Sequence, residues 1–166
     1  QQRLEQLTQG FIAGGVDLIW IETMSDLTEV KAAIQGVRRV APGIPLIATM
    51  TFDTRGRTMM GVTPEQAVVA LDAWGADAVG GNCGNGPDEI EGVISKMHAT
   101  NPGAALVAKA NAGLPHMEGD AAVYDATPEI MAAYALRVRD AGARIIGACC
   151  GSTPAHIQAI AAVLRE

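Results

Sequence analysis

Short apolar runs alternate with helical patterns along the chain, and this alternation constrains the fold more than any other feature. Each run has the length and continuity of a strand that is buried on both faces. The runs lie at 16–22, 45–50, 77–82, 105–109 and 144–148. The helical patterns lie at about 26–40, 64–74, 87–99, 128–141 and 154–165. Strands and helices in this order predict an α/β fold with a parallel sheet.

The starts of three predicted helices carry a second signal. Each begins with threonine followed by proline, at Thr63-Pro64, Thr127-Pro128 and Thr153-Pro154. The threonine side chain can accept a hydrogen bond from an exposed amide of the first turn, and proline at the next position has no amide to leave unpaired. These pairs therefore support the helix boundaries that the apolar pattern predicts.

Five parallel strands fit an open doubly wound sheet or part of a (β/α)8 barrel, and composition does not separate the two. The polar residues favour the barrel, because a barrel gathers its reacting groups at the C-terminal ends of its strands. Five polar or thiol side chains fall at or just past predicted strand ends: Glu22, Cys83, Asn111, Cys149 and Cys150.

Charge and hydropathy exclude several classes of partner. The 18 acidic and 12 basic residues give a formal net charge of -6, and no basic run offers phosphate contacts, so we expect no nucleic acid partner. No apolar stretch reaches the roughly 20 residues of a membrane span, and the start QQRLEQLTQG lacks the features of a signal peptide. We expect a soluble cytoplasmic protein without a membrane partner. The chain opens inside an amphipathic helical pattern, so we also expect a segment upstream.

The three cysteines are candidate metal ligands. Zinc favours soft thiolates, and a site with three protein ligands leaves one position for a substrate or water. The spacing of 66 residues between Cys83 and Cys149 does not match a zinc finger, so the ligands would meet only in a folded scaffold (149 − 83 = 66). Adjacent Cys149 and Cys150 would form a strained disulfide, which favours reduced sulfur. The alternative is that the cysteines are small buried apolar residues.

The residues around the cysteines carry a family resemblance. GGNCGNGP at 80–87 and GACCGSTPAHI at 147–157 resemble the two zinc motifs of the homocysteine S-methyltransferase family. Three further segments, at 16–26, 51–66 and 110–120, resemble that family's fourth, fifth and seventh strands with their loops. The run Asn-Ala-Gly-Leu-Pro resembles the cobalamin-dependent methionine synthase branch more than the branch that uses betaine.

The resemblance implies a TIM-type barrel to which this chain contributes about strands four to eight. We expect residues 1–166 to form one domain, the C-terminal portion of a homocysteine-binding barrel without its first three strands. Five strands alone would leave two unpaired edges. An N-terminal barrel segment or a second copy of the chain is therefore expected as a partner.

The resemblance also implies an activity. Cys83, Cys149 and Cys150 would hold zinc, and the enzyme would transfer a methyl group to the thiol of homocysteine to form methionine. The expected donor is methylcobalamin or another methyl-corrinoid on a separate domain or protein, with betaine or S-methylmethionine as alternatives. A different possibility is a catalytically incomplete zinc-binding domain that acts as a structural or regulatory partner.

Two further residues receive substrate-binding roles from the resemblance. Glu22 would hold the ammonium of homocysteine, whereas its sequence context alone also fits a carboxylate at a helix N-terminus. Asn111 would line the site and could fill the fourth zinc position until substrate displaces it, although asparagine before Ala-Gly is more often a turn former. Asn82 is expected to brace the loop beside Cys83.

The remaining polar candidates have simpler interpretations. His98 and His156 are expected to be surface or packing residues, and only His116 follows a strand closely enough to approach substrate. Arg55 and Arg57 could contact an anionic group on a donor, but a solvated turn is the favoured interpretation of their loop.

Overall fold

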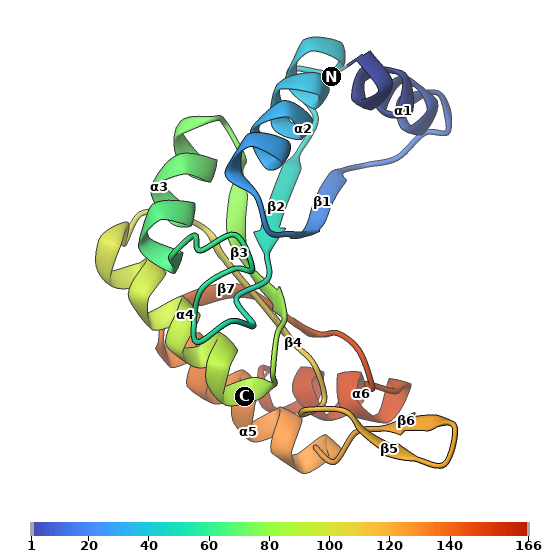
Figure 1. Ribbon diagram of the computed structural model, residues 1–166, viewed down its shortest axis with the longest axis vertical. Coiled ribbons are helices and arrows are strands. Elements are labelled where there is room, and N and C mark those ends of the chain that lie inside the picture. The colour runs from blue at the N-terminus through green and yellow to red at the C-terminus, as the bar shows by residue number, and fades with distance from the viewer. Residues whose placement is uncertain (1, 166) are drawn as a thin grey trace.

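The computed structural model describes residues 2–165, which form a parallel sheet with helices along its outer side (Figure 1). The sheet has five strands in the order β1-β2-β3-β4-β7. Their bounds are β1 Ile19–Met24, β2 Leu46–Met50, β3 Ala78–Cys83, β4 Leu106–Ala110 and β7 Ala143–Ala148. The helices are α1 Gln2–Ala13, α2 Leu27–Val40, α3 Pro64–Ala73, α4 Pro87–Thr100, α5 Pro128–Asp140 and α6 Pro154–Val163.

The order of the strands decides between the two α/β architectures. All four strand pairs are parallel, and each strand of the large sheet lies beside the one that precedes it in the chain. A doubly wound sheet would instead reverse its order at a switch point. The βα units therefore run in one direction, as in a (β/α)8 barrel, and the predicted fold class is confirmed for this five-stranded part. Among the described residues, β1 and β7 form the two edges of the sheet.

Helix starts follow the threonine–proline signal. The hydroxyl of Thr63 accepts from the amide of Gln66 at 3.2 Å, and that of Thr127 accepts from the amide of Ile130 at 3.4 Å. At α6 the first turn is closed by His156, whose Nδ1 accepts from the Thr153 amide at 3.0 Å. The predicted boundaries of α3, α5 and α6 agree with the structure to within two residues at each end.

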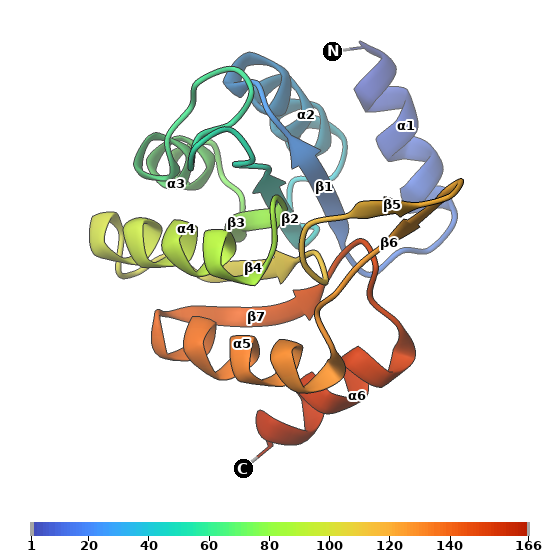
Figure 2. The same ribbon diagram turned by 60° about the horizontal axis from the view of Figure 1, so that its bottom comes forward.

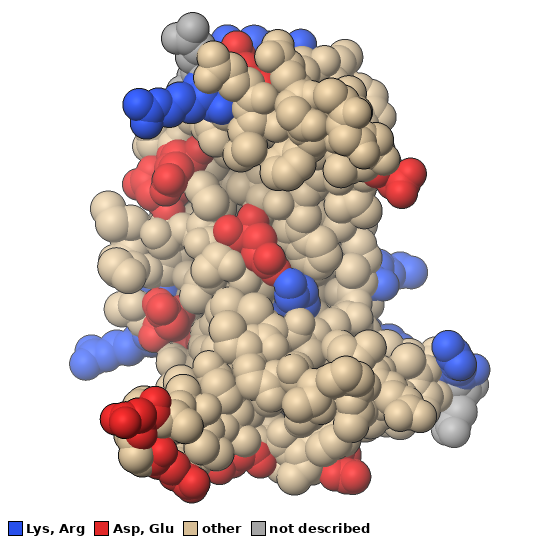
Figure 3. Space-filling model, turned by 90° about the vertical axis from the view of Figure 1, so that its right-hand side faces the viewer, with Lys and Arg blue, Asp and Glu red and all other residues tan. Residues whose placement is uncertain are grey.

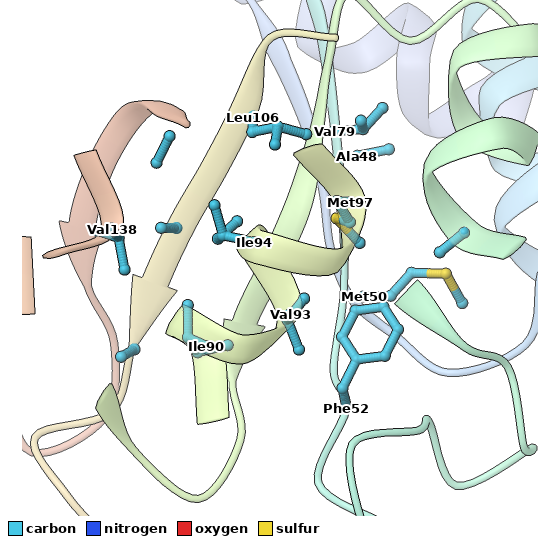
Figure 4. Packing of buried hydrophobic residues seen from close by; sticks show 14 of the residues in the cluster. Ala48, Met50, Phe52, Val79, Ile90, Val93, Ile94, Met97, Leu106 and Val138 are labelled. Carbon is cyan, nitrogen blue, oxygen red and sulfur yellow. The ribbon is translucent and has the colours of Figure 1, made fainter. Parts of the chain in front are cut away.

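The main hydrophobic core lies between the outer face of the sheet and the helices (Figure 4). Alternate strand residues such as Ala48, Val79 and Leu106 point to this side and pack against α4 residues such as Ile94. The opposite, inner face of the sheet carries a second, smaller cluster around Ile47, Ala78 and Val107. Burial on both faces explains the continuous apolar runs of the sequence.

Two local features differ from the sequence-based expectation. Strand β1 begins at Ile19 and not at residue 16, and it continues past Glu22 to Met24, so Glu22 lies within the strand and not at its end. A hairpin of β5 His116–Glu118 and β6 Ala121–Val123 was not predicted. Figure 2 shows it on the side of the sheet away from α3 and α4. None of the helices within residues 2–165 combines the length and the apolar character that a membrane span needs.

Candidate metal centre

The three cysteines lie together at the C-terminal ends of two strands. Cys83 is the last residue of β3, and Cys149 and Cys150 directly follow β7. Their Sγ atoms all lie within 4.8 Å of one another, and the Sγ atoms of Cys83 and Cys149 are 2.9 Å apart. Cys83 and Cys149 are partly buried, whereas Cys150 is exposed. The cluster therefore opens to solvent on one side and can hold a metal ion.

Backbone hydrogen bonds join these two strand ends through the end of β4. The carbonyl of Cys83 accepts from the amide of Asn111 at 3.4 Å, and the amide of Cys149 donates to the carbonyl of Ala110 at 2.7 Å. The amide of Ala112 donates to the carbonyl of Cys150 at 2.9 Å. The segment 110–112 thus fixes the spacing between cysteines that are 66 residues apart in the chain.

The side chain of Asn111 continues this bracing. It is 7% exposed, its Oδ1 accepts from the Cys150 amide at 3.0 Å, and its Nδ2 donates to the Gly84 carbonyl at 2.8 Å. One amide group therefore ties the loop after Cys83 to the loop after Cys149. The expected contact of Asn111 with metal or substrate stays a prediction.

Asn82 connects the first cysteine to strand β1. It is fully buried, its Oδ1 accepts from the Thr23 amide at 3.0 Å, and its Nδ2 lies 2.8 Å from Thr23 Oγ1 and 3.4 Å from Cys83 Sγ. Thr23 and Cys83 both have left-handed backbone, with φ of 63° and 59°. A β-branched residue at such a φ is strained, and the hydrogen bonds of Asn82 hold it there. The expectation that Asn82 braces the loop agrees with these contacts.

The Cys83 thiol favours its protonated form when no metal is bound. Burial raises the pKa of the Cys83 thiol to about 12, and the neighbouring sulfurs of Cys149 and Cys150 add to the shift. Desolvation and then the Cys150 sulfur also raise the pKa of the Tyr124 phenol. Tyr124 packs directly on this loop, because a Cβ at Gly151 would lie 2.2 Å from its ring. Only a cation would compensate the charge of several thiolates in this position.

Glu22 forms an ion pair on the inner face of the sheet. Its Oε1 accepts from Nζ of Lys109, a residue of β4, and the two side chains are 38% and 22% exposed. The same Nζ lies 4.9 Å from the centroid of the Trp20 ring, whose Nε1 donates to Thr49 Oγ1 at 3.1 Å. The helix N-terminus that was an alternative environment for Glu22 is capped by Asp26, whose carboxylate accepts from the Glu29 amide.

None of the described histidines belongs to the metal-ligand cluster of the three cysteines. His156 is buried, and its Nε2 is 2.8 Å from the carbonyl of Ala126, so it serves packing as expected. His116 lies in the exposed hairpin within 3.3 Å of the carboxylates of Glu118 and Asp125. Arg57 donates to the carbonyl of Gly61 at 3.3 Å within its own turn.

Three residues around the centre were not identified from the sequence. Lys109 sits within an apolar run, and nothing in the sequence identifies which residue is its partner, 87 residues away. Tyr124 follows a hairpin that the apolar pattern does not reveal. Thr23 shows its role only through its φ of 63°. The one available signal was a lysine inside a buried strand, because such a charge requires a partner.

Comparison with known proteins identifies relatives along nearly the whole chain. Residues 1–164 match the family model described as homocysteine S-methyltransferase. The chain is 36% identical over 164 residues to a methionine synthase of Mycobacterium tuberculosis and 34% identical to one of Mycobacterium leprae. These matches cover 95% of this chain but only 14% and 13% of the two relatives.

Solved structures show the same fold. The apo form of the Escherichia coli homocysteine methyltransferase MmuM superposes with a TM-score of 0.75 at 22% identity, covering 98% of this chain and 56% of that one. Its metallated form gives a TM-score of 0.76 and covers 97% and 51%. The chain thus spans about half of that barrel enzyme and a small part of the methionine synthases. Because the family model matches almost all of it, the chain belongs to the homocysteine S-methyltransferase family.

Proposed function

We propose that this chain holds a zinc ion on Cys83, Cys149 and Cys150 and serves the transfer of a methyl group to the thiol of homocysteine, which forms methionine. The observation that carries the proposal is the convergence of three Sγ atoms within 4.8 Å at the C-terminal strand ends of a member of this family. Barrel enzymes use that end of the sheet for their chemistry.

The donor set fits zinc. Three thiol sulfurs are soft ligands, and Zn–S bonds of ~2.3 Å in a tetrahedral site imply sulfur separations of about 3.8 Å. The 4.8 Å limit of this cluster allows that spacing, while the 2.9 Å contact of Cys83 with Cys149 would lengthen when both bind one ion. Exposed Cys150 leaves an open side through which a fourth ligand can enter.

When bound, zinc supplies Lewis acidity that lowers the pKa of a coordinated thiol, so that the thiol is deprotonated at neutral pH. The residues of the chain do the rest. Asn82 orients the Cys83 sulfur, and Asn111 holds the two cysteine loops at their separation. Such contacts around the ligands fix their geometry and tune affinity. The Glu22 carboxylate on the inner face holds the ammonium of the amino acid.

For the methyl donor we propose a methylated corrinoid carried by another domain or protein. The similarity to two methionine synthases supports it, and the chain covers only 14% and 13% of their lengths. The Asn-Ala-Gly-Leu-Pro run that begins at Asn111 supports the same branch. Betaine and S-methylmethionine are the alternative donors.

The test combines metal content with methyl transfer. The purified chain should bind one zinc per molecule and, when supplied with methylcobalamin, convert homocysteine to methionine. Bound zinc without transfer from any of the three donors would favour a structural or regulatory zinc domain over an enzyme.

The ligand assignment has its own test. Cys83→Ala should reduce zinc stoichiometry to a small fraction and abolish transfer, because two thiolates hold zinc far more weakly than three. Ser152→Ala is the matched control. Ser152 lies in the loop that contains Cys149 and Cys150, and its buried hydroxyl has no hydrogen-bond partner among the described residues. Full zinc occupancy in Cys83→Ala would refute the assignment.

A further inference from the structure

The ion pair of Glu22 and Lys109 spans the inner face of the sheet. Strands β1 and β4 are separated by β2 and β3, so in a flat sheet they would lie about 14 Å apart at ~4.8 Å per strand. Direct contact between the two side chains means that the sheet curves toward them. The pair therefore lies in a concave surface. Figure 3 views the molecule from the right-hand side of Figure 1, and this face is mostly uncharged, with one acidic and one basic group in contact near its middle.

Lys109 lies close to Cys83 along the strands. Lys109 is in register with Asn82 on one side and with Gly147 on the other, and the next residue in each strand leads to Cys83 and Ala148. Gly147 leaves room for the lysine, because a Cβ there would be 3.3 Å from Lys109 Cγ. The backbone of Lys109 thus lies one residue before the level of Cys83 and two residues before that of Cys149.

The charge balance of this pair limits what can bind to it. A substrate ammonium on Glu22 would compete with the ammonium of Lys109, whose side chain is only 22% exposed. A partly buried cation without a counterion is costly. A ligand that brings an ammonium alone would leave that cost uncompensated. A ligand with an ammonium and a carboxylate on one carbon would pair with both side chains, and the net charge of the site would stay at zero.

We propose that Lys109 binds the carboxylate of the amino acid substrate, so that Glu22 and Lys109 together recognise the zwitterionic head group. This inference rests on the proposed function. Trp20 supports it, because its ring lies 4.9 Å from Nζ and limits the positions that the lysine can take when it leaves Glu22. Lys109 is then a specificity-determining residue that selects α-amino acids over simple amines.

The experiment measures thiol binding to the full chain loaded with Co(II) in place of zinc. Three thiols are compared by calorimetry and by the thiolate-to-cobalt absorption band: homocysteine, 3-aminopropanethiol, which lacks the carboxylate, and 4-mercaptobutyrate, which lacks the ammonium. Lys109→Met should weaken homocysteine binding by ~10- to 100-fold, the range of one lost charged hydrogen bond. It should leave 3-aminopropanethiol binding unchanged or tighter, because Glu22 is then free of its internal cation.

Controls separate this role from a structural one. Lys109→Arg keeps the cation and should retain most of the preference for homocysteine. Lys31→Met removes another lysine that lies over a tryptophan ring, 5.3 Å from the Trp74 centroid, and should change no affinity. Glu22→Gln should weaken the binding of homocysteine and 3-aminopropanethiol, which both carry an ammonium, and should not weaken the binding of 4-mercaptobutyrate.

The outcomes also separate the two proposals. If the ratio of the affinities for homocysteine and 3-aminopropanethiol is the same in Lys109→Met as in the wild type, the carboxylate role of Lys109 is wrong while the proposed function stands. If homocysteine produces no new thiolate band in the wild-type chain, the proposed function fails, and the role of Lys109 fails with it.

Discussion

The side-chain oxygen of Asn111 accepts a hydrogen bond from the backbone amide of Cys150 at 3.0 Å. The other end of the same amide group donates to the carbonyl of Gly84, next to Cys83. One buried side chain therefore sets the separation of two ligand loops that belong to different strands. Asn111 thus has a structural task that its place in a Gly-containing turn does not reveal.

Replacing Asn111 by alanine should weaken both the fold and the metal site. The Cys150 amide and the Gly84 carbonyl would lose their partner at a residue that is 7% exposed. We expect a loss of about 1–3 kcal/mol in the free energy of unfolding of the metal-free chain. Zinc affinity should fall on the order of 10- to 100-fold, as for other residues that orient ligands. Urea unfolding and competition with a chelator measure the two effects.

A matched asparagine controls for the substitution itself. Asn101 follows α4, and its Nδ2 donates to the Asp72 carboxylate at 3.2 Å in a solvent-exposed hydrogen bond. Asn101→Ala should leave zinc affinity unchanged. Equal zinc affinity in Asn111→Ala and the wild type would mean that the cysteine loops hold their spacing without this side chain.

Zinc affinity should depend steeply on pH. The pKa of Cys83 is raised to about 12 in the metal-free chain, so its proton is bound throughout the neutral range and must leave when the sulfur becomes a ligand. Competition from this proton alone should lower the apparent zinc affinity about tenfold for each unit by which the pH falls between roughly pH 9 and 6. Chelator competition at several pH values gives the slope. In Cys83→Ala the slope should be shallower by one proton, and an unchanged slope would contradict the assignment.

The end of β4 has a second support in Tyr134. This fully buried residue of α5 accepts a hydrogen bond from the Ala110 amide at 3.2 Å. Tyr134→Phe keeps the ring and leaves that amide without a partner, so we expect a loss of about 1–3 kcal/mol in unfolding free energy. Chemical denaturation measures it, with partly buried Tyr124→Phe as the comparison. A variant as stable as the wild type would mean that water replaces the hydroxyl.

Much of the fold could be predicted because local signals agree with the tertiary structure. Strands buried on both faces produce continuous apolar runs, and threonine–proline pairs mark the helix starts. The hairpin β5–β6 was missed because its strands have three residues each and mostly exposed side chains, which leave no apolar alternation. The start of β1 was misplaced because residues 16–18 are apolar in part yet exposed.

The candidate site, like the fold, could be predicted only in part from the sequence. The three cysteines could be identified because their flanking residues form a recognisable pattern, and parallel strand ends meet at one edge of the sheet. The pair of Glu22 and Lys109 could not, because its two residues meet only when a sheet of several strands curves. The left-handed φ of Thr23 was equally hidden, since threonine rarely adopts it and the hydrogen bonds that hold it come from Asn82 in another strand.

Close contact between β3 and β4 makes Gly80 intolerant of any larger residue. A Cβ at Gly80 would lie 1.9 Å from the carbonyl oxygen of Val107 and 2.8 Å from its backbone nitrogen, and backbone atoms of a central strand cannot move aside singly. Gly80→Ala should therefore cost about 3 kcal/mol or more. Gly92→Ala is the control, because a Cβ there meets no atom within 4 Å and alanine is favoured over glycine in helix α4 by ~1 kcal/mol. In urea unfolding, the midpoint should fall for Gly80→Ala and rise slightly for Gly92→Ala. An unchanged midpoint in Gly80→Ala would show that the two strands do not approach as closely as this contact requires.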